Sequence, residues 1–284
     1  MPLFRRHDGD LIRGTRPMRG IMPYLMPRRN ESIVLTDTMF RIQETRDWLK
    51  AYNRTHAERA TLFHLLAYAV GQALHARPEL NRFVSGGRLY QRRGVQLSFV
   101  VKKELSDDGE STTVKFEVAR GEPFARFAAR LASAIRDAQT TDRTVDRETA
   151  LIMRLPGPLV RALVAVARRL DQWNLFPRFM TASDPMFASM FLANLGSVGI
   201  SDAYHHLYEY GTVSIFGAVS APAYHSFMDG GALNVQPGLR VRWSFDERIH
   251  DAFYGARSLG LVTEIFEHPQ VHLGAPAGDP AFAG

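Results

Sequence analysis

Five polar or titratable side chains stand within six residues near the end of the chain, and their types could move protons. They are Asp246, Glu247, Arg248, His250 and Asp251. A carboxylate or an imidazole acts as a general base when its pKa lies near the working pH, so Glu247 and His250 are candidate bases. Burial would raise the pKa of Glu247, whereas Arg248 beside it opposes that rise. Without a catalytic role, the same residues would form a strand-to-helix turn held by ion pairs.

A second titratable group precedes the first and contains His205, His206 and Glu209. On a helix, His205 and Glu209 would share a face because they are four residues apart. A zinc site would need a further ligand, and the sequence supplies none at metal-ligand spacing. We therefore expect no bound metal, and we keep His205 and His206 as candidate bases.

The residues around the first group indicate how it is positioned. Apolar and polar residues alternate from 239 to 245, which is the period of a half-buried strand. From 252 to 266 the apolar residues fall on one helical face. Asp251 stands where a helix N-cap accepts backbone N–H bonds. The titratable residues are therefore predicted to lie in a short turn between a strand and a helix.

Periodicity and turn residues predict the other elements. They are a strand within 31–40, a helix over 57–76, a hairpin of 95–99 with 114–118 through a turn at 106–109, a helix over 124–135, a helix over 158–172 and a turn at 228–231. The first helix should end before Pro78, because a proline disfavours helical backbone in the preceding residue.

Composition indicates a folded protein. The chain has 284 residues, of which 45% are hydrophobic and 18 are Phe, so apolar material for a core is ample. Cys is absent, which excludes disulfides, thiolate metal sites and a Cys nucleophile, and fits the reducing cytoplasm in which we expect the protein. No run reaches the roughly 18 uncharged apolar residues of a membrane-spanning helix. The charged start, 1–8, is unlike a signal peptide.

The formal net charge of +6 predicts attraction to anions. A phosphorylated cofactor such as coenzyme A would suit a basic channel mouth. The Arg residues are scattered, and no nucleic-acid-binding motif accompanies them, so nucleic acid is not an expected partner.

Two segments resemble a known family. Ser244-Phe245-Asp246-Glu247-Arg248-Ile249-His250-Asp251-Ala252, with Ala256-Arg257-Ser258-Leu259, is similar to the signature Ser-Phe-Asp-His-Arg-x-x-Asp-Gly of the 2-oxoacid dehydrogenase acyltransferases. Phe191-Leu192-Ala193-Asn194-Leu195-Gly196 resembles that family's Thr-Ile-Ser-Asn-Leu-Gly. The family shares its fold and mechanism with chloramphenicol acetyltransferase. The resemblance thus implies an α/β, coenzyme A-dependent acyltransferase fold with a mixed sheet covered by helices.

The resemblance also implies site residues and an assembly. The family's catalytic His corresponds to Glu247, and its oxyanion-binding Ser corresponds to Ala193, so both catalytic groups are replaced. Asn194 and Arg248 are retained motif residues, and the resemblance implies that Arg19 pairs with Asp251. It further implies a homotrimer or a higher assembly of trimers and a coenzyme A thioester as acyl donor. It places 201–212 as a hydrogen-bonded wall beside the channel.

The expected domain organisation is an extended arm over 1–30, an acyltransferase-like domain over 31–268 and a flexible tail over 269–284. This chain carries no lipoyl-attachment segment. A helical insertion at about 140–186 has no counterpart in the family, and its helix opposes an apolar side to Arg161, Arg168 and Arg169. This insertion could pack on a neighbouring subunit, contact a membrane peripherally through 156–180 or cover an acyl channel.

Two functional hypotheses follow. The first is an acyltransferase that transfers an acyl group between coenzyme A and a thiol, with the base relocated to Glu247, His250, His205 or His206. The second is a non-catalytic homologue that keeps the trimeric scaffold for binding or assembly. An alternative register aligns His250 with the family's catalytic His, but it breaks the matches at Asp246, Arg248 and Asp251. Both hypotheses predict negligible acetyl transfer from acetyl-coenzyme A to dihydrolipoamide.

Overall fold

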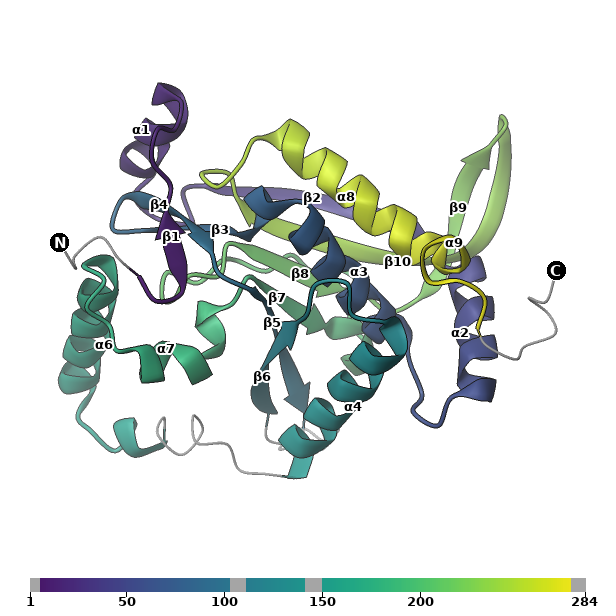
Figure 1. Cartoon of the computed structure of the whole chain (residues 1–284), viewed down its shortest axis with the longest axis horizontal. Helices are drawn as coiled ribbons and strands as arrows, with labels where there is room; N and C mark the ends of the chain where they lie inside the picture. Colours follow the sequence, from purple (N-terminus) through teal and green to yellow (C-terminus); the bar gives the residue numbers. More distant parts are fainter. Residues whose placement is uncertain (1–5, 103–110, 141–149, 277–284) are drawn as a thin grey trace.

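A mixed seven-stranded β-sheet forms the centre of the computed structural model, which describes residues 6–102, 111–140 and 150–276 (Figure 1). Its strands are β2 (Ile33–Arg41), β5 (Val95–Lys102), β6 (Ser111–Val118), β7 (Met190–Asn194), β8 (Ile215–Val219), β9 (Ala223–Asp229) and β10 (Ala232–Asp246). They follow the order β2-β10-β8-β7-β5-β6, and β9 pairs with the first half of β10. The β5–β7 and β7–β8 pairs are parallel and the others are antiparallel. The expected mixed sheet is confirmed.

Helices cover one face of this sheet. They include α3 (Leu62–Ala76), α4 (Phe124–Thr140) and α8 (Ala252–Glu267), with α2 (Gln43–Thr55) and α9 (Pro269–Leu273) near one end (Figure 1). The main apolar core lies between these helices and the sheet, because β-sheet and helix each bury one apolar face against the other. The sequence-predicted helix over 57–76 begins only at Leu62, and the sequence analysis missed α2.

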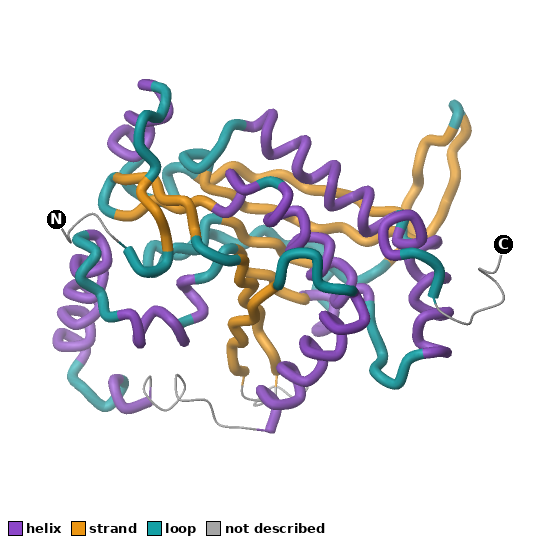
Figure 2. Tube along the Cα trace, viewed as in Figure 1, coloured by secondary structure: helices purple, strands orange, loops and turns teal. Residues whose placement is uncertain are grey.

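The opposite face of the sheet carries a smaller apolar cluster. It is built from Ala188, Phe191, Leu207, Val213, Phe216 and Ala218. Short 3₁₀ turns lead into and out of this region, namely η3 (Pro185–Phe187) before β7 and η4 (Leu195–Val198) after it. The segment from 199 to 214 crosses this face without helix or strand (Figure 2).

The N-terminal arm is more structured than predicted. Its described part contains a short strand, β1 (Gly9–Leu11), and a helix, α1 (Pro17–Leu25). The strand pairs with β4 (Arg88–Arg92), which also pairs with β3 (Arg82–Ser85) after the 3₁₀ turn η2 (Pro78–Asn81). Pro17 stands at the first helical turn, where its missing N–H is harmless. The expectation of an extended arm therefore holds for β1 and is wrong over the helix Pro17–Leu25.

The insertion contains α6 (Gly157–Gln172) and α7 (Arg178–Ser183), and α6 agrees closely with the predicted helix. Its C-terminal end is fixed to the rest of the chain. Asp171 accepts from Arg6 Nη2 at 2.7 Å, and the Gln172 carbonyl accepts from Arg88 Nη2 at 2.6 Å. The rest of α6 is largely exposed (Figure 1). Residues 141–149 lie outside the described part.

Several local predictions are confirmed. The hairpin of β5 and β6 pairs in antiparallel register, although its predicted turn at 106–109 lies outside the described residues. The turn at 228–231 joins β9 to β10 through Gly230 and Gly231, both at positive φ. The predicted loose tail begins instead with α9, and the indole of Trp48 donates to the Gly274 carbonyl at 2.9 Å. No described helix has the length and apolar character needed to span a bilayer.

Candidate functional site

A buried ion pair holds the turn that follows β10. Arg248 donates from Nη2 to Asp246 Oδ2 at 2.7 Å and from Nε to Oδ1 at 2.8 Å, and both side chains are almost fully buried. Asp246 also accepts from the Ser32 hydroxyl at 3.0 Å. Arg248 Nη1 donates to the Met26 carbonyl at 2.8 Å. Arg248 therefore fixes the turn and the neighbouring arm, and its guanidinium is committed to structure.

The expected Arg19–Asp251 ion pair is not formed. Arg19 Nη1 donates to the backbone carbonyl of Glu247 at 2.6 Å, and no ion pair joins it to Asp251 in the described part of the chain. The Asp251 carboxylate instead accepts from the backbone N–H of Tyr254 at 2.7 Å and caps α8, as its position before the helix predicts. The Asp251 carboxylate is therefore bound by the backbone at the start of α8. Arg19, on α1, reaches the same turn but binds its backbone at Glu247 instead.

His250 is the buried histidine in the turn between β10 and α8. Its side chain is 2% exposed, and its ring stacks on Phe245 with centroids 5.2 Å apart. Nδ1 donates to the Asp251 carbonyl at 2.8 Å, so Nε2 carries the lone pair. Nε2 has no hydrogen-bond partner among the described residues. Burial lowers the pKa of His250 below its ordinary value, so the imidazole is neutral near pH 7.

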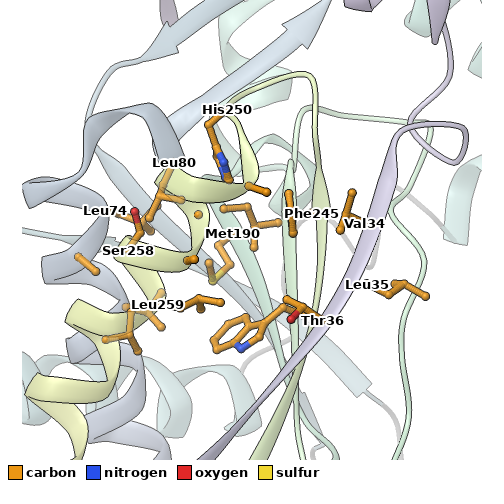
Figure 3. A pocket seen from close by; sticks show the side chains of 18 residues that line it. Val34, Leu35, Thr36, Leu74, Leu80, Met190, Phe245, His250, Ser258 and Leu259 are labelled. Atoms are coloured by element: carbon orange, nitrogen blue, oxygen red, sulfur yellow. The ribbon is translucent and has the colours of Figure 1, made fainter.

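An apolar cavity of about 340 Å³ lies next to His250. It is enclosed by β2, β10, α3 and α8, and Figure 3 shows the imidazole pointing into it from one end. Its walls include Val34, Leu80, Met190, Trp243, Phe245 and Leu259. The small residues Ala252, Gly255 and Ala256 line it from α8. This arrangement resembles a ligand pocket, which is concave, mostly apolar and equipped with a few polar groups.

A second hollow, of about 710 Å³, meets the cavity at His250. Its charged lining residues are Arg16, Arg19, Glu79, Arg82, Glu247 and Asp251. The two hollows share the lining residues Val34, Phe245, His250 and Ala252. His250 thus lies between an apolar cavity and a charged one, whose lining has as many carboxylates as arginines. Glu247 lines only the charged hollow, where it is half-buried.

The structure places His205 and His206 away from His250. They lie in an extended segment rather than a helix, which corrects the i, i+4 arrangement with Glu209. The Ser244 hydroxyl donates to the His205 carbonyl, whereas the next side chain, Phe245, faces the cavity. Successive strand residues point to opposite faces, so the two histidines lie across the sheet from His250. The part of the chain that the structure describes contains no cluster of three potential metal ligands.

Within one chain, Ala193 and Asn194 also lie far from His250. Asn194 is opposite Val219, which is opposite Val241, and β10 continues for five residues beyond that point to Asp246. At about 3.3 Å per residue, the two motifs are on the order of 16 Å apart along the sheet. The described residues of a single chain therefore do not bring both motifs to one reaction centre.

Comparison with known proteins identifies the fold. No protein-family model and no curated protein matches the chain. A probable dihydrolipoamide acetyltransferase from Listeria monocytogenes is similar with a TM-score of 0.59 at 12% identity, over 89% of this chain and 94% of that one. The truncated 2-oxoacid dehydrogenase core of Thermoplasma acidophilum gives 0.57 at 13%, over 91% and 98%. A chloramphenicol acetyltransferase gives 0.52 at 14%, over 91% and 98%. The chain has the chloramphenicol acetyltransferase-like fold.

The sequence analysis included His250 among its candidates but did not predict the apolar cavity beside it. His250 was a candidate, but the motif alignment gave the catalytic position to Glu247. The available signal was the run of small residues Ala252, Gly255 and Ala256 on the inner side of α8. A Cβ on Gly255 would stand 2.8 Å from the His250 ring, so glycine leaves room for the imidazole.

Proposed function

We propose that the protein is an acyltransferase in which His250 is the general base. The observation that carries this proposal is the state of His250. The ring is buried and neutral and lines an apolar cavity, one nitrogen is fixed by a backbone carbonyl, and the other is buried without a hydrogen-bond partner among the described residues. A general base must be deprotonated and within reach of the proton that it takes, and this imidazole meets the first condition.

The proposed reaction moves an acyl group between two nucleophiles. Nε2 of His250 takes the proton of an acceptor thiol, and the sulfur attacks the carbonyl carbon of the acyl thioester. The tetrahedral intermediate collapses, the bond to the donor sulfur breaks, and that thiolate recovers the proton from Nε2. Ala193 offers no hydroxyl for the oxyanion, so we expect slower turnover than in an enzyme with such a donor.

The two hollows support an amphipathic thioester as substrate. The apolar cavity would hold the hydrocarbon part of the acyl group, because burying apolar surface is favourable. The charged hollow would hold the polar end of the donor. Its carboxylates balance its arginines in number, but Arg16 and Arg19 form no ion pair among the described residues, whereas Arg82 pairs with Glu79. The phosphate groups of coenzyme A would suit Arg16 and Arg19. We therefore propose acyl-coenzyme A thioesters with chains longer than acetyl as donors.

The decisive experiment measures release of free coenzyme A from thioesters of increasing chain length, with a small thiol as acceptor. His250→Asn should lower the rate by about 10²–10⁴, the usual effect of losing a general base. His205→Asn is the matched control and should stay within about twofold of wild type, because His205 lies on the other face of the sheet. Equal rates for wild type and His250→Asn would refute the assignment.

A non-catalytic scaffold is the second candidate, and the residues at 193 and 247 favour it. Ala193 lacks the hydroxyl of the resembled family, and Glu247 stands in place of its catalytic His. We propose a homotrimer for either function, from the resemblance. Wild-type protein that binds long-chain acyl-coenzyme A without any release of coenzyme A would favour the scaffold.

A further inference from the structure

Arg29 is a buried cation that forms no ion pair. Its side chain belongs to a residue only 5% exposed, and no ion pair reaches it within the described ranges. Nη1 donates to the Tyr208 carbonyl at 2.8 Å, and Nη2 donates to the Val84 carbonyl at 3.4 Å. Nε is buried and has no partner. Burial lowers the pKa of Arg29, and the carboxylates of Asp246 and Glu209 offset this only in part. An anion bound beside this guanidinium would therefore be favourable.

A polar cavity of about 460 Å³ lies beside Arg29. Its charged lining residues are Arg28, Arg29, Arg168, Arg248, Asp171 and Glu209, four cations against two anions. Both carboxylates already have donors. Asp171 accepts from Arg6 and from the Ser85 hydroxyl, and Glu209 accepts from the backbone N–H groups of Arg29 and Asn30. Three of the lining charges already form ion pairs, namely Arg248 with Asp246, Arg28 with Glu31 and Asp171 with Arg6. Arg29 and Arg168 then stand against Glu209, so the cavity keeps a small positive excess. It shares no lining residue with the hollows at His250.

The insertion supplies one wall of this cavity. Arg168 lies on α6 one turn before Asp171, whose ion pair with Arg6 fixes that end of the helix. The turn between β3 and β4 packs closely on the same end, because a Cβ on Gly86 would stand 2.3 Å from the Gln172 carbonyl. Arg168 makes no ion pair in the part of the chain described. The buried Arg29 and the exposed Arg168 thus line one cavity, and neither forms an ion pair among the described residues.

We propose that this cavity binds the phosphate group of a small phosphorylated molecule. The two guanidinium groups present several N–H donors at one cavity, and guanidinium groups match the oxygens of a phosphate well. The cavity exceeds the size of inorganic phosphate, so an organic part would fit beside Tyr24 and Tyr210, which also line it. The insertion then closes a ligand site, a role separate from the chemistry at His250.

Calorimetric titration of the full chain tests this site. Inorganic phosphate and adenosine monophosphate would be titrated separately into protein in chloride buffer of matched ionic strength. We expect binding of both, weakened about tenfold or more by Arg168→Ala, because each charge-assisted hydrogen bond contributes strongly. Arg161→Ala is the matched control, since Arg161 lies on the same helix but does not line the cavity. It should change the affinity by less than about twofold.

The variants also separate this proposal from general basicity. Equal losses in Arg161→Ala and Arg168→Ala would overturn it, as would phosphate that binds no better than chloride. Arg29→Met should abolish binding. If that variant does not fold, the comparison of Arg168→Ala with Arg161→Ala decides alone. Binding only to vesicles that contain phosphatidic acid, lost in Arg168→Ala, would identify the phosphate as that of a lipid headgroup.

Discussion

His250 Nδ1 lies 2.8 Å from the carbonyl oxygen of Asp251, and this contact determines which ring nitrogen carries the proton. A carbonyl only accepts hydrogen bonds, so Nδ1 must be the donor. The lone pair is then on Nε2, which has no hydrogen-bond partner among the described residues, on a ring that lines the apolar cavity. Asp251 thus acts twice, because its carboxylate caps α8 while its carbonyl orients the proposed base.

The rate of acyl transfer should depend on pH through His250. Burial lowers the pKa of this residue below 6.5, so its imidazole is protonated only at a lower pH than an ordinary histidine is. We expect kcat/KM to remain level from pH 8 to 6.5 and to fall only at lower pH. The same shift means that the unfolded chain binds this proton first, so the unfolding free energy also falls as the pH drops below 6.5.

Measurements of kcat/KM between pH 4.5 and 8 test this dependence. Buffers of constant ionic strength keep the screening of the charges in the second hollow unchanged as the pH varies. An acidic limb with its midpoint above 6.5 would contradict a neutral, buried imidazole as the base.

Removal of Asp246 should destabilise the fold severely. Asp246→Ala would leave the guanidinium of Arg248 buried without its partner, and breaking such a pair costs about 3–5 kcal/mol. Chemical denaturation measures this loss. Asp202→Ala is the control, because Asp202 pairs with Arg242 at the surface, where an ion pair contributes about 0–1 kcal/mol. Similar losses of unfolding free energy in both variants would show that the buried ion pair stabilises the fold no more than the surface pair does.

Replacing Asp251 should lower the free energy of unfolding by less than replacing a residue of a buried ion pair would. Asp251→Ala removes a helix cap, which costs about 0.5–2 kcal/mol. Asp251→Asn should stay near wild type, because an amide oxygen caps almost as well as a carboxylate. Equilibrium unfolding of both variants provides the measurement. A loss above about 3 kcal/mol in Asp251→Asn would indicate that its charge pairs with a cation after all.

Features that depend on neighbouring residues could be predicted from the sequence. The alternation in β10, the cap at Asp251 and the end of α3 before Pro78 all follow from backbone chemistry within a few residues. The fold followed from two motifs that match a family in order. The motif after residue 243 predicted the end of β10 and the start of α8, and the structure has both elements there.

Features that depend on side-chain direction in an irregular segment could not be predicted. The motif alignment favoured Glu247, but the turn after β10 directs His250 inward and leaves Glu247 in the charged hollow. The partner of Arg19 depends on where α1 lies, and α1 was missed because its sequence is rich in Pro and Gly. His205 depends on which face of the sheet an extended segment crosses. The spacing of apolar and polar residues along the sequence does not predict any of these three arrangements.

The apolar stripe of α6 should be an assembly surface. Leu159, Leu163 and Val166 are 46%, 43% and 55% exposed, and exposed apolar patches of this kind mark interaction sites. The triple variant Leu159→Gln, Leu163→Gln, Val166→Gln should weaken assembly, as measured by light scattering across a concentration series. A trimer is the expected wild-type state. Deleting 156–180 would be a poorer test, because it also removes Asp171 and leaves Arg6 buried without this partner.

The alternative covering for this stripe is an anionic membrane. Arg161 and Arg169 flank the apolar residues, and a basic amphipathic helix can lie in a headgroup layer. The control variant Arg161→Gln, Arg169→Gln keeps the stripe and removes two charges. We expect it to assemble as wild type does, and we expect the triple variant to sediment with anionic liposomes no less than wild type. If the triple variant keeps its oligomeric state but no longer sediments with anionic liposomes, the stripe is a membrane surface instead.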